Sequence, residues 1–150
     1  MAASPSGRSS KTFRESLALI ACSFVLGCGS GTGPTDPLAL IAAELDAAVA
    51  GGDVDRIRAH LAHETPAVRA LAAQAAAVAA DWDSMPRLIE LIDDKDPAVR
   101  ARALAACAAL IGMDHGHDPL ATPADRAKAK ATVARAYETM RRNPPPQYRK

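Results

Sequence analysis

A five-residue segment occurs twice in this chain, and this repeat restricts the possible fold more than any other feature. Pro66-Ala-Val-Arg-Ala70 and Pro97-Ala-Val-Arg-Ala101 are identical and begin 31 residues apart. The same shift aligns apolar residues on either side, including Ile57 with Leu88, Leu61 with Ile92 and Ala72 with Ala103. Self-similarity at such a period is typical of solenoids, in which each unit buries its apolar face only against neighbouring units.

The spacing of apolar residues within and around the two copies predicts helices. Pro66 and Pro97 suit the first turn of a helix, where a missing N–H costs nothing. The residues expected to cap helix starts are Asp53, Thr65, Ser84 and Asp96, and Gly51-Gly52 should end the first helix. The expected helices cover residues 37–50, 53–61, 66–79, 84–92, 97–111 and 123–142. In the helix from Pro66, one face carries Val68, Leu71, Ala72, Ala75, Val78 and Ala79, and we expect it to be buried.

Composition supports a helical fold without strands. The chain is 49% hydrophobic but only 3% aromatic, so its core must consist of Ala, Leu, Val and Ile. Alanine is the strongest helix former. We therefore predict an all-α domain over residues 37–143, a short α-solenoid of stacked antiparallel helix hairpins, with the helices 37–50 and 123–142 covering its two ends.

The first 27 residues have the three parts of an export signal. Arg8, Lys11 and Arg14 precede an apolar segment, residues 17–26, and small residues follow it. As a helix, ten residues span about 15 Å, too short for a hydrocarbon core roughly 30 Å thick. We expect cleavage before Cys28 and a flexible tether over residues 28–36, which are rich in Gly, Ser, Thr and Pro. An ordinary secreted protein or an uncleaved disordered tail are the alternatives.

Val25-Leu26-Gly27-Cys28 resembles the lipobox of bacterial lipoproteins, although Val25 and Leu26 stand where that family usually has Leu and a small residue. The resemblance implies diacylglycerol on the Cys28 thiol and allows acylation, for example by palmitate, of its new amino group. Two or more acyl chains give a stable membrane anchor. The expected location is the bacterial cell envelope, with the domain in the periplasm or at the cell surface.

Asp96-Pro-Ala-Val-Arg-Ala-Arg-Ala-Leu104 resembles the short HEAT-like repeat, also called the phycobilisome-lyase-type repeat, with its Asp-x-x-Val-Arg pattern. Glu64-Thr-Pro-Ala-Val-Arg69 is similar but lacks the Asp. The resemblance covers residues 53–111 and implies a right-handed stack of helix pairs that binds an unknown protein partner through one face. We therefore expect an interaction module and no enzyme, with no cofactor and no small-molecule substrate. The formal net charge of +1 does not favour nucleic acid.

Three residues are candidates for partner binding. Arg69 and Arg100 recur at one repeat position and could bind an acidic partner. Alternatively each reaches an acidic residue or a helix C-terminus of the preceding unit, with Asp93 or Asp94 as the candidate for Arg100. Trp82, the only Trp, lies in a predicted turn that should expose part of it. It is either a partner anchor, a common role for Trp, or it packs across the end of a hairpin.

One segment offers metal-ligand chemistry. Asp114, His115, His117 and Asp118 lie within five residues and supply nitrogen and oxygen donors suited to zinc or another divalent ion. The alternative is a structural loop in which glycines permit turns and Asp side chains accept hydrogen bonds from backbone amides. A metal-binding periplasmic protein and a purely structural envelope component are therefore alternative functions.

Two further features complete the sequence-based expectations. Cys107 lies among Ala and Leu without a nearby base, which predicts a buried, unreactive thiol. Residues 144–150 begin with three prolines and end in two basic residues, and we expect them to form a disordered tail.

Overall fold

The computed structural model describes residues 36–113, 116–143 and 146–148, and its regular elements are helical. The α-helices are α1 (Pro37–Gly51), α2 (Val54–His60), α3 (Pro66–Val78), α4 (Met85–Leu91), α5 (Pro97–Ile111) and α6 (Pro123–Arg141). Two short 3-10 helices are η1 (Trp82–Ser84) and η2 (Pro146–Tyr148). No strand occurs among the described residues, so the predicted all-α fold is confirmed.

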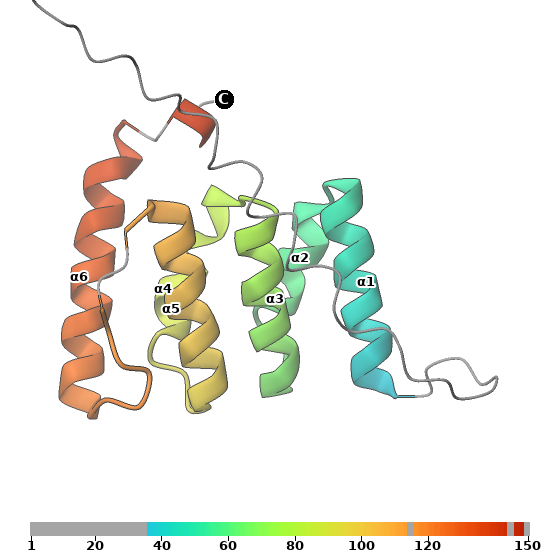
Figure 1. Ribbon diagram of the computed structural model, residues 1–150, viewed down its shortest axis with the longest axis horizontal. Helices are drawn as coiled ribbons and strands as arrows, with labels where there is room; N and C mark the ends of the chain where they lie inside the picture. Colours follow the sequence, from blue (N-terminus) through green and yellow to red (C-terminus); the bar gives the residue numbers. More distant parts are fainter. Residues whose placement is uncertain (1–35, 114–115, 144–145, 149–150) are drawn as a thin grey trace, which may run out of the picture. The chain divides into compact units, whose positions relative to one another are not determined.

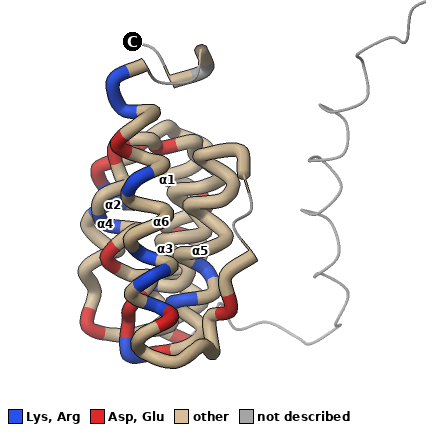
Figure 2. The backbone as a smooth tube through the Cα atoms, turned by 90° about the vertical axis from the view of Figure 1, so that its left-hand side faces the viewer, with Lys and Arg blue, Asp and Glu red and all other residues tan. Residues whose placement is uncertain are grey.

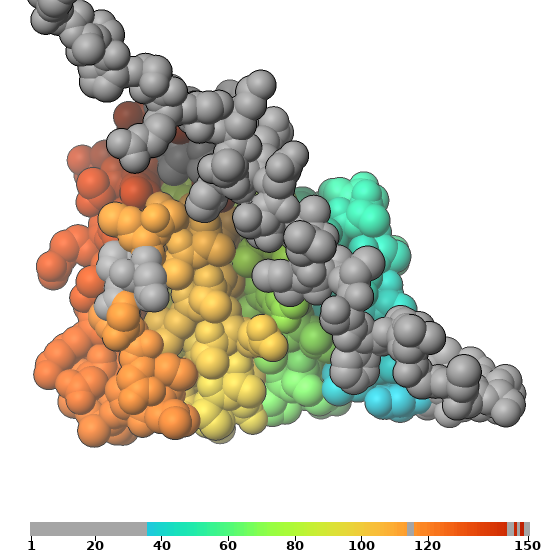
Figure 3. Space-filling model, in the orientation of Figure 1, coloured from blue at the N-terminus to red at the C-terminus, as the bar shows by residue number. Residues whose placement is uncertain are grey.

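The helices stack as hairpins (Figure 1). α3 lies between α1 and α5 and packs on both, so these three helices form one row, the long-helix row. The shorter helices α2 and α4 pack against α3 and α5, respectively. In the space-filling view, α3 (green) and α5 (yellow) form a continuous surface (Figure 3). The first complete unit is therefore α2–α3 and the second is α4–α5, the order that the 31-residue repeat predicts.

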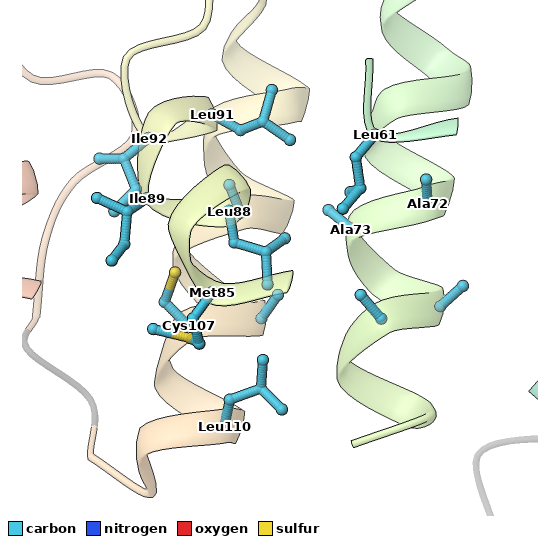
Figure 4. Close-up of a cluster of buried hydrophobic side chains, with 14 of the residues drawn as sticks. Leu61, Ala72, Ala73, Met85, Leu88, Ile89, Leu91, Ile92, Cys107 and Leu110 are labelled. Carbon is cyan, nitrogen blue, oxygen red and sulfur yellow. The ribbon is translucent and has the colours of Figure 1, made fainter. Parts of the chain in front are cut away.

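The core lies between successive units. Met85 and Leu88 of α4 and Cys107 and Leu110 of α5 are all buried. Figure 4 shows Leu88 and Leu110 pointing toward the first unit, where Leu61 and Ala73 face them. The facing positions of α3 are alanines, and small side chains allow α3 and α5 to approach closely. Each unit thus completes the apolar core of the next one.

The predicted buried face of α3 is partly wrong. Val78 is 67% exposed and Leu71 is only partly buried, whereas Ala73 and Ala76 are fully buried. The reason is that α3 has neighbours on two sides, α1 and α5, so its buried surface is wider than a single helical stripe. Alanines fill this surface, and Val78 falls outside it.

Two of the four predicted N-caps are confirmed. The Asp53 carboxylate accepts a hydrogen bond from Arg56 N, and the Asp96 carboxylate accepts two, from Ala98 N and Val99 N. Thr65 makes no such bond, and the Ser84 hydroxyl donates to the Asp81 carboxylate instead. The helix end at Gly51-Gly52 is also confirmed, because Gly52 has a φ of +71°, the left-handed conformation that favours glycine.

A third unit follows α5, and its first helix is replaced by a loop. Thr122-Pro-Ala-Asp-Arg-Ala127 repeats the Pro-Ala-x-Arg-Ala pattern at the start of α6. Arg126, near this start, bonds to Asp93 beyond the end of α4, whereas Tyr137, near the end of α6, contacts Trp82 just before α4. α6 therefore runs antiparallel to α4 and takes the place of a second helix. In the order of the chain, the segment between α5 and α6, here called the loop 112–122, takes the place of the unit's first helix.

The two ends of the stack are covered as expected. α1 packs against α2 and α3, and α6 packs against α4 and α5. In the repeat pattern, α1 corresponds to the second helix of a unit that precedes α2. The repeat domain therefore consists of two complete units between two incomplete ones.

Candidate functional site

One arginine occupies the same position in the two complete units and in the third unit, and in each it donates to backbone oxygens of the preceding loop. Arg69 Nη1 donates to the backbone oxygens of His63 and Glu64, both at 2.8 Å. Arg100 Nη1 donates to the backbone oxygens of Asp94 and Lys95, both at 3.0 Å. Arg126 Nη1 donates to Ala121 O at 3.0 Å. In each unit the guanidinium thus ties the first turn of a long helix to the loop before it, and we call this contact the arginine clasp.

The Nε side of the same arginines reaches a different partner in each unit. Arg69 forms two hydrogen bonds of 2.9 Å with the Asp94 carboxylate of the second unit. Arg100 donates to Pro119 O at 2.6 Å, in the loop before α6. Arg126 donates to Asp93 at 2.9 Å.

The expectation that Arg69 and Arg100 reach the preceding unit is therefore wrong. Both extend forward along the stack with their Nε sides, because the segment before the long helix of the next unit lies beside the start of each long helix. The Asp94 carboxylate pairs with Arg69, and Arg100 takes only the Asp94 backbone oxygen. Arg100 is buried and Arg69 is largely buried. Their guanidinium N–H groups form hydrogen bonds within the domain. Binding of an acidic partner through them stays a prediction.

Asp94 is the carboxylate that joins the two complete units. Its burial raises the pKa, but hydrogen bonds from Arg69 and from the Asp96 backbone N–H outweigh burial, so the pKa of Asp94 is lowered overall. The carboxylate therefore stays ionised at neutral pH. Its place between two units makes it a structural link.

A second buried carboxylate, Asp81, joins α2 to the turn after α3. Arg58 Nε donates to Asp81 at 2.8 Å, its Nη2 donates to the other carboxylate oxygen, and the Ser84 hydroxyl donates as well. The hydrogen bond to Asp81 is the main reason why the pKa of Arg58 is raised. This cluster holds the segment that carries Trp82.

Trp82 lies in an aromatic cluster near the ends of α3 and α6. It is 9% exposed, so the expected partial exposure is wrong. Its ring centroid lies 5.4 Å from that of Tyr137 in α6 and 5.0 Å from that of Tyr148, and the Tyr148 ring is stacked on it at 23°. Burial raises the pKa of Tyr137. Trp82 therefore packs across the end of its hairpin, and its role as a partner anchor stays a prediction.

The position of Tyr148 also corrects the expectation for the chain end. Residues 144–150 were expected to be a disordered tail. Of these, the structure describes Pro146–Tyr148, which form η2, and Tyr148 packs against the core, whereas residues 144–145 and 149–150 lie outside the described residues. Sequence reasoning could not find this contact, because Tyr148 and Trp82 are far apart in the chain and no local sequence pattern predicts that the two side chains pack together. The Trp82 ring holds Tyr148 against the core.

A comparison with known protein families matched residues 54–141 to HEAT repeats. The chain belongs to this family. The match begins at the first residue of α2 and ends at the last residue of α6, so it includes the third unit, which the sequence resemblance over residues 53–111 left out. Searches of curated proteins and of solved structures gave no match. HEAT repeats commonly mediate protein–protein interactions, which favours an interaction module.

The loop 112–122 of the HEAT domain is structural where it is described. Asp118 accepts a hydrogen bond from Leu120 N at 2.7 Å, the bond expected of a structural turn. His117 and Pro119 line a pocket of about 400 Å3 with residues of α5 and α6. Asp114 and His115 lie outside the described residues, and the described part of the chain contains no group of three or more His, Cys, Asp or Glu side chains that could hold a metal ion. Metal binding by Asp114, His115, His117 and Asp118 stays a prediction.

The lipid-anchor residues cannot be placed. Cys28, the export signal over residues 1–27 and residues 28–35 of the tether lie outside the described residues. Among the helices that the structure describes, none is long and apolar enough to cross a membrane. Lipidation of Cys28 therefore stays a prediction.

Proposed function

We propose that this HEAT-repeat protein is a non-catalytic protein-interaction module held at a membrane of the bacterial cell envelope by lipid on Cys28. The observation that carries the proposal is the match of residues 54–141 to HEAT repeats. A stack of helix pairs presents an extended surface of side chains, and such surfaces suit protein partners. The alternatives, a metal-binding protein and a purely structural envelope component, have no comparable support.

The charges of the domain favour a protein partner over nucleic acid. Figure 2 shows Lys, Arg, Asp and Glu mixed over α6, which faces the viewer, and over the turns, whereas the side formed by the long-helix row is mostly uncharged. The formal net charge of the whole chain is only +1. Nucleic-acid binding depends on a concentrated positive patch that neutralises phosphates. Mixed charge beside an uncharged row is more typical of surfaces that bind proteins.

The chemistry of the described side chains supports a role without catalysis. Asp81, Asp94 and Arg100 bond to groups that hold the fold together. Cys107, the free cysteine in the described part of the chain, is buried, and burial raises the pKa of its thiol to about 12. A nucleophilic cysteine needs the opposite shift. These groups are structural in their present surroundings.

The anchor is proposed from the sequence around Cys28. Residues 28–36 can extend to about 30 Å at most, since each residue spans roughly 3.3–3.6 Å. A lipid on Cys28 would therefore keep α1 close to the membrane surface. A partner in the same membrane would meet the domain at a high local concentration.

Metabolic labelling with an alkyne fatty acid tests the anchor. The wild-type chain should take up the label and sediment with membranes, and Cys28→Ala should lose both properties. Cys22→Ala is the matched control, because Cys22 lies in the expected signal, and it should behave as wild type. Label retained by Cys28→Ala, or absent from wild type, would refute the anchor.

Cross-linking in intact cells followed by mass spectrometry tests the interaction. The wild-type chain should capture the same protein in replicate experiments, at a yield well above that of an exported, lipidated protein of unrelated fold. Cys28→Ala should capture that protein less efficiently, because it loses the membrane. Equal, non-specific capture by wild type and the unrelated protein would refute an interaction module.

A further inference from the structure

The ring faces of Trp82 and Tyr137 form one surface, here called the aromatic surface, between η1 and α6. The two ring centroids are 5.4 Å apart and the rings are tilted by 46°. Asp81, whose carboxylate is bonded by Arg58 and Ser84, holds the backbone just before Trp82. Both rings are thus carried on fixed elements.

The occupant of this surface is the end of the chain itself. Tyr148 stacks on Trp82 with ring centroids 5.0 Å apart. Tyr148 belongs to η2, which lies beyond the end of α6 (Figure 1). The segment around Tyr148 reads Pro144-Pro-Pro-Gln-Tyr-Arg-Lys150, a proline run followed by an aromatic residue and two basic residues. Proline-rich segments are a common ligand of aromatic surfaces, because they lose little conformational entropy on binding.

The rim of the aromatic surface is acidic. Three carboxylates, those of Asp55, Asp81 and Asp83, lie within ion-pair distance of the single guanidinium of Arg58. Asp83 and Glu138 also act on the Tyr137 hydroxyl, where both raise its pKa, while Arg141 lowers it. Because carboxylates outnumber guanidinium groups here, the rim favours a segment that carries positive charge next to its aromatic residue.

We propose that the aromatic surface is a docking site for a short segment of a partner protein, with an aromatic side chain between prolines and basic residues. Tyr148 occupies the site in cis, and the sequence around it indicates which chemistry the site takes. A partner segment of the same kind displaces Tyr148 and stacks on Trp82. This inference rests on the proposed function as an interaction module and names its surface and the chemistry of its partner.

Tryptophan fluorescence of the full chain tests the first half of the proposal, because Trp82 is the only Trp. Tyr148→Ala should shift the emission of Trp82 to longer wavelength, since the stacked ring no longer shields the indole from water. Tyr148→Phe is the matched control and should keep the wild-type spectrum. Circular dichroism should show unchanged helix content in both variants. An unchanged emission in folded Tyr148→Ala would refute the contact.

A synthetic peptide with the sequence of residues 144–150 tests the second half. Added to the Tyr148→Ala chain, it should return the emission of Trp82 saturably toward the wild-type spectrum. The same peptide with alanine in place of the tyrosine should have no effect. The wild-type chain should bind a dye-labelled form of the peptide, followed by fluorescence anisotropy, with an affinity at least tenfold lower than that of the Tyr148→Ala chain, because a tethered segment competes at an effective concentration on the order of millimolar. Equal effects of the two peptides would overturn the proposal.

Two further outcomes separate this inference from its alternatives. A concentration-dependent dimer of the wild-type chain that Tyr148→Ala abolishes would make a second copy the occupant and overturn the assignment to a partner protein. The peptide experiment does not depend on Cys28 or on any captured protein. If the chain binds the peptide but carries no lipid, the docking site is supported and the lipid anchor is refuted. If the chain is lipidated but does not bind the peptide, the anchor is supported and the docking site is refuted.

Discussion

The second and third units of the stack follow the same repeat pattern but are held together differently. In the second unit, α4 contributes a full set of buried apolar residues, Met85, Leu88, Ile89 and Leu91. In the third unit, the loop 112–122 replaces the first helix, and α6 buries only Ala129 and Val133. Polar and aromatic contacts attach α6 instead, through Arg126 and Tyr137. The comparison shows that a unit without its short first helix lacks the large buried side chains that α4 supplies, and that polar and aromatic contacts hold its long helix instead.

The largest expected effect on stability follows from truncating a buried side chain in the core of the second unit. Leu88 is fully buried, and Leu88→Ala should lower the free energy of unfolding by about 2–5 kcal/mol, the range for Leu→Ala in a packed core. Leu120, in the loop of the third unit, is 73% exposed. Leu120→Ala is the matched control and should change the free energy by less than about 0.5 kcal/mol. Urea unfolding followed by circular dichroism measures both. Similar losses for the two variants would contradict the comparison.

The next effect concerns the ion pairs of the repeated arginine. Arg69 and Asp94 are both largely buried, and Arg69→Met should cost about 1.5–3 kcal/mol, because charged hydrogen bonds are lost and Asp94 keeps a buried charge. Asp93, the partner of Arg126, is about half exposed. Arg126→Met should cost only about 0.2–1 kcal/mol. The same unfolding experiment measures which variant loses more stability. A larger loss of unfolding free energy for Arg126→Met than for Arg69→Met would contradict the comparison.

A smaller effect is the dependence of stability on pH. Because the pKa of Asp94 is lowered in the folded protein, its ionisation stabilises the fold above the unfolded-state pKa of about 3.9. This contribution is lost as the pH falls through the lower, folded-state pKa. The stability advantage of wild type over Arg69→Met should therefore be constant from pH 7 to about pH 5 and shrink below about pH 4. An advantage that does not change between pH 5 and pH 3 would show that the carboxylate is not the source.

The smallest expected signal is the alkylation of Cys107, which is buried inside the second unit between α5 and α4. Figure 4 shows its sulfur beside that of Met85. Since burial raises the pKa of the thiol to about 12, almost no thiolate forms at pH 8. The peptide containing Cys107 should remain unmodified by iodoacetamide in the native protein and become modified in urea, as measured by mass spectrometry. Rapid native labelling would show that the contact between α4 and α5 opens readily.

Much of the fold could be predicted from local sequence signals. Helix starts followed from Pro66, Pro97 and Pro123, and the Asp96 cap from its place before Pro97. The predicted helices 84–92 and 97–111 correspond to α4, Met85–Leu91, and α5, Pro97–Ile111. These features depend on residues close in the chain, where backbone sterics and capping decide the outcome.

Contacts between units were harder to predict. The pairing of Arg69 with Asp94 depends on how one hairpin lies on the next, which no local pattern specifies. The exposure of Val78 depends on α3 having neighbours on two sides. The third arginine, Arg126, did have a signal, Pro-Ala-x-Arg-Ala at 123–127, but it begins 26 residues after Pro97 instead of 31. A search at one fixed period overlooks it.

The arginine clasp has a consequence for how such a chain can change its length. Arg69, Arg100 and Arg126 each bind the backbone of their own loop with one nitrogen, and only the remaining donors depend on the neighbouring unit. A gene duplication that copies one hairpin therefore also copies the arginine and the loop backbone that it binds. Insertions and losses of whole hairpins should be tolerated during evolution, and the number of units can vary without redesign of each turn.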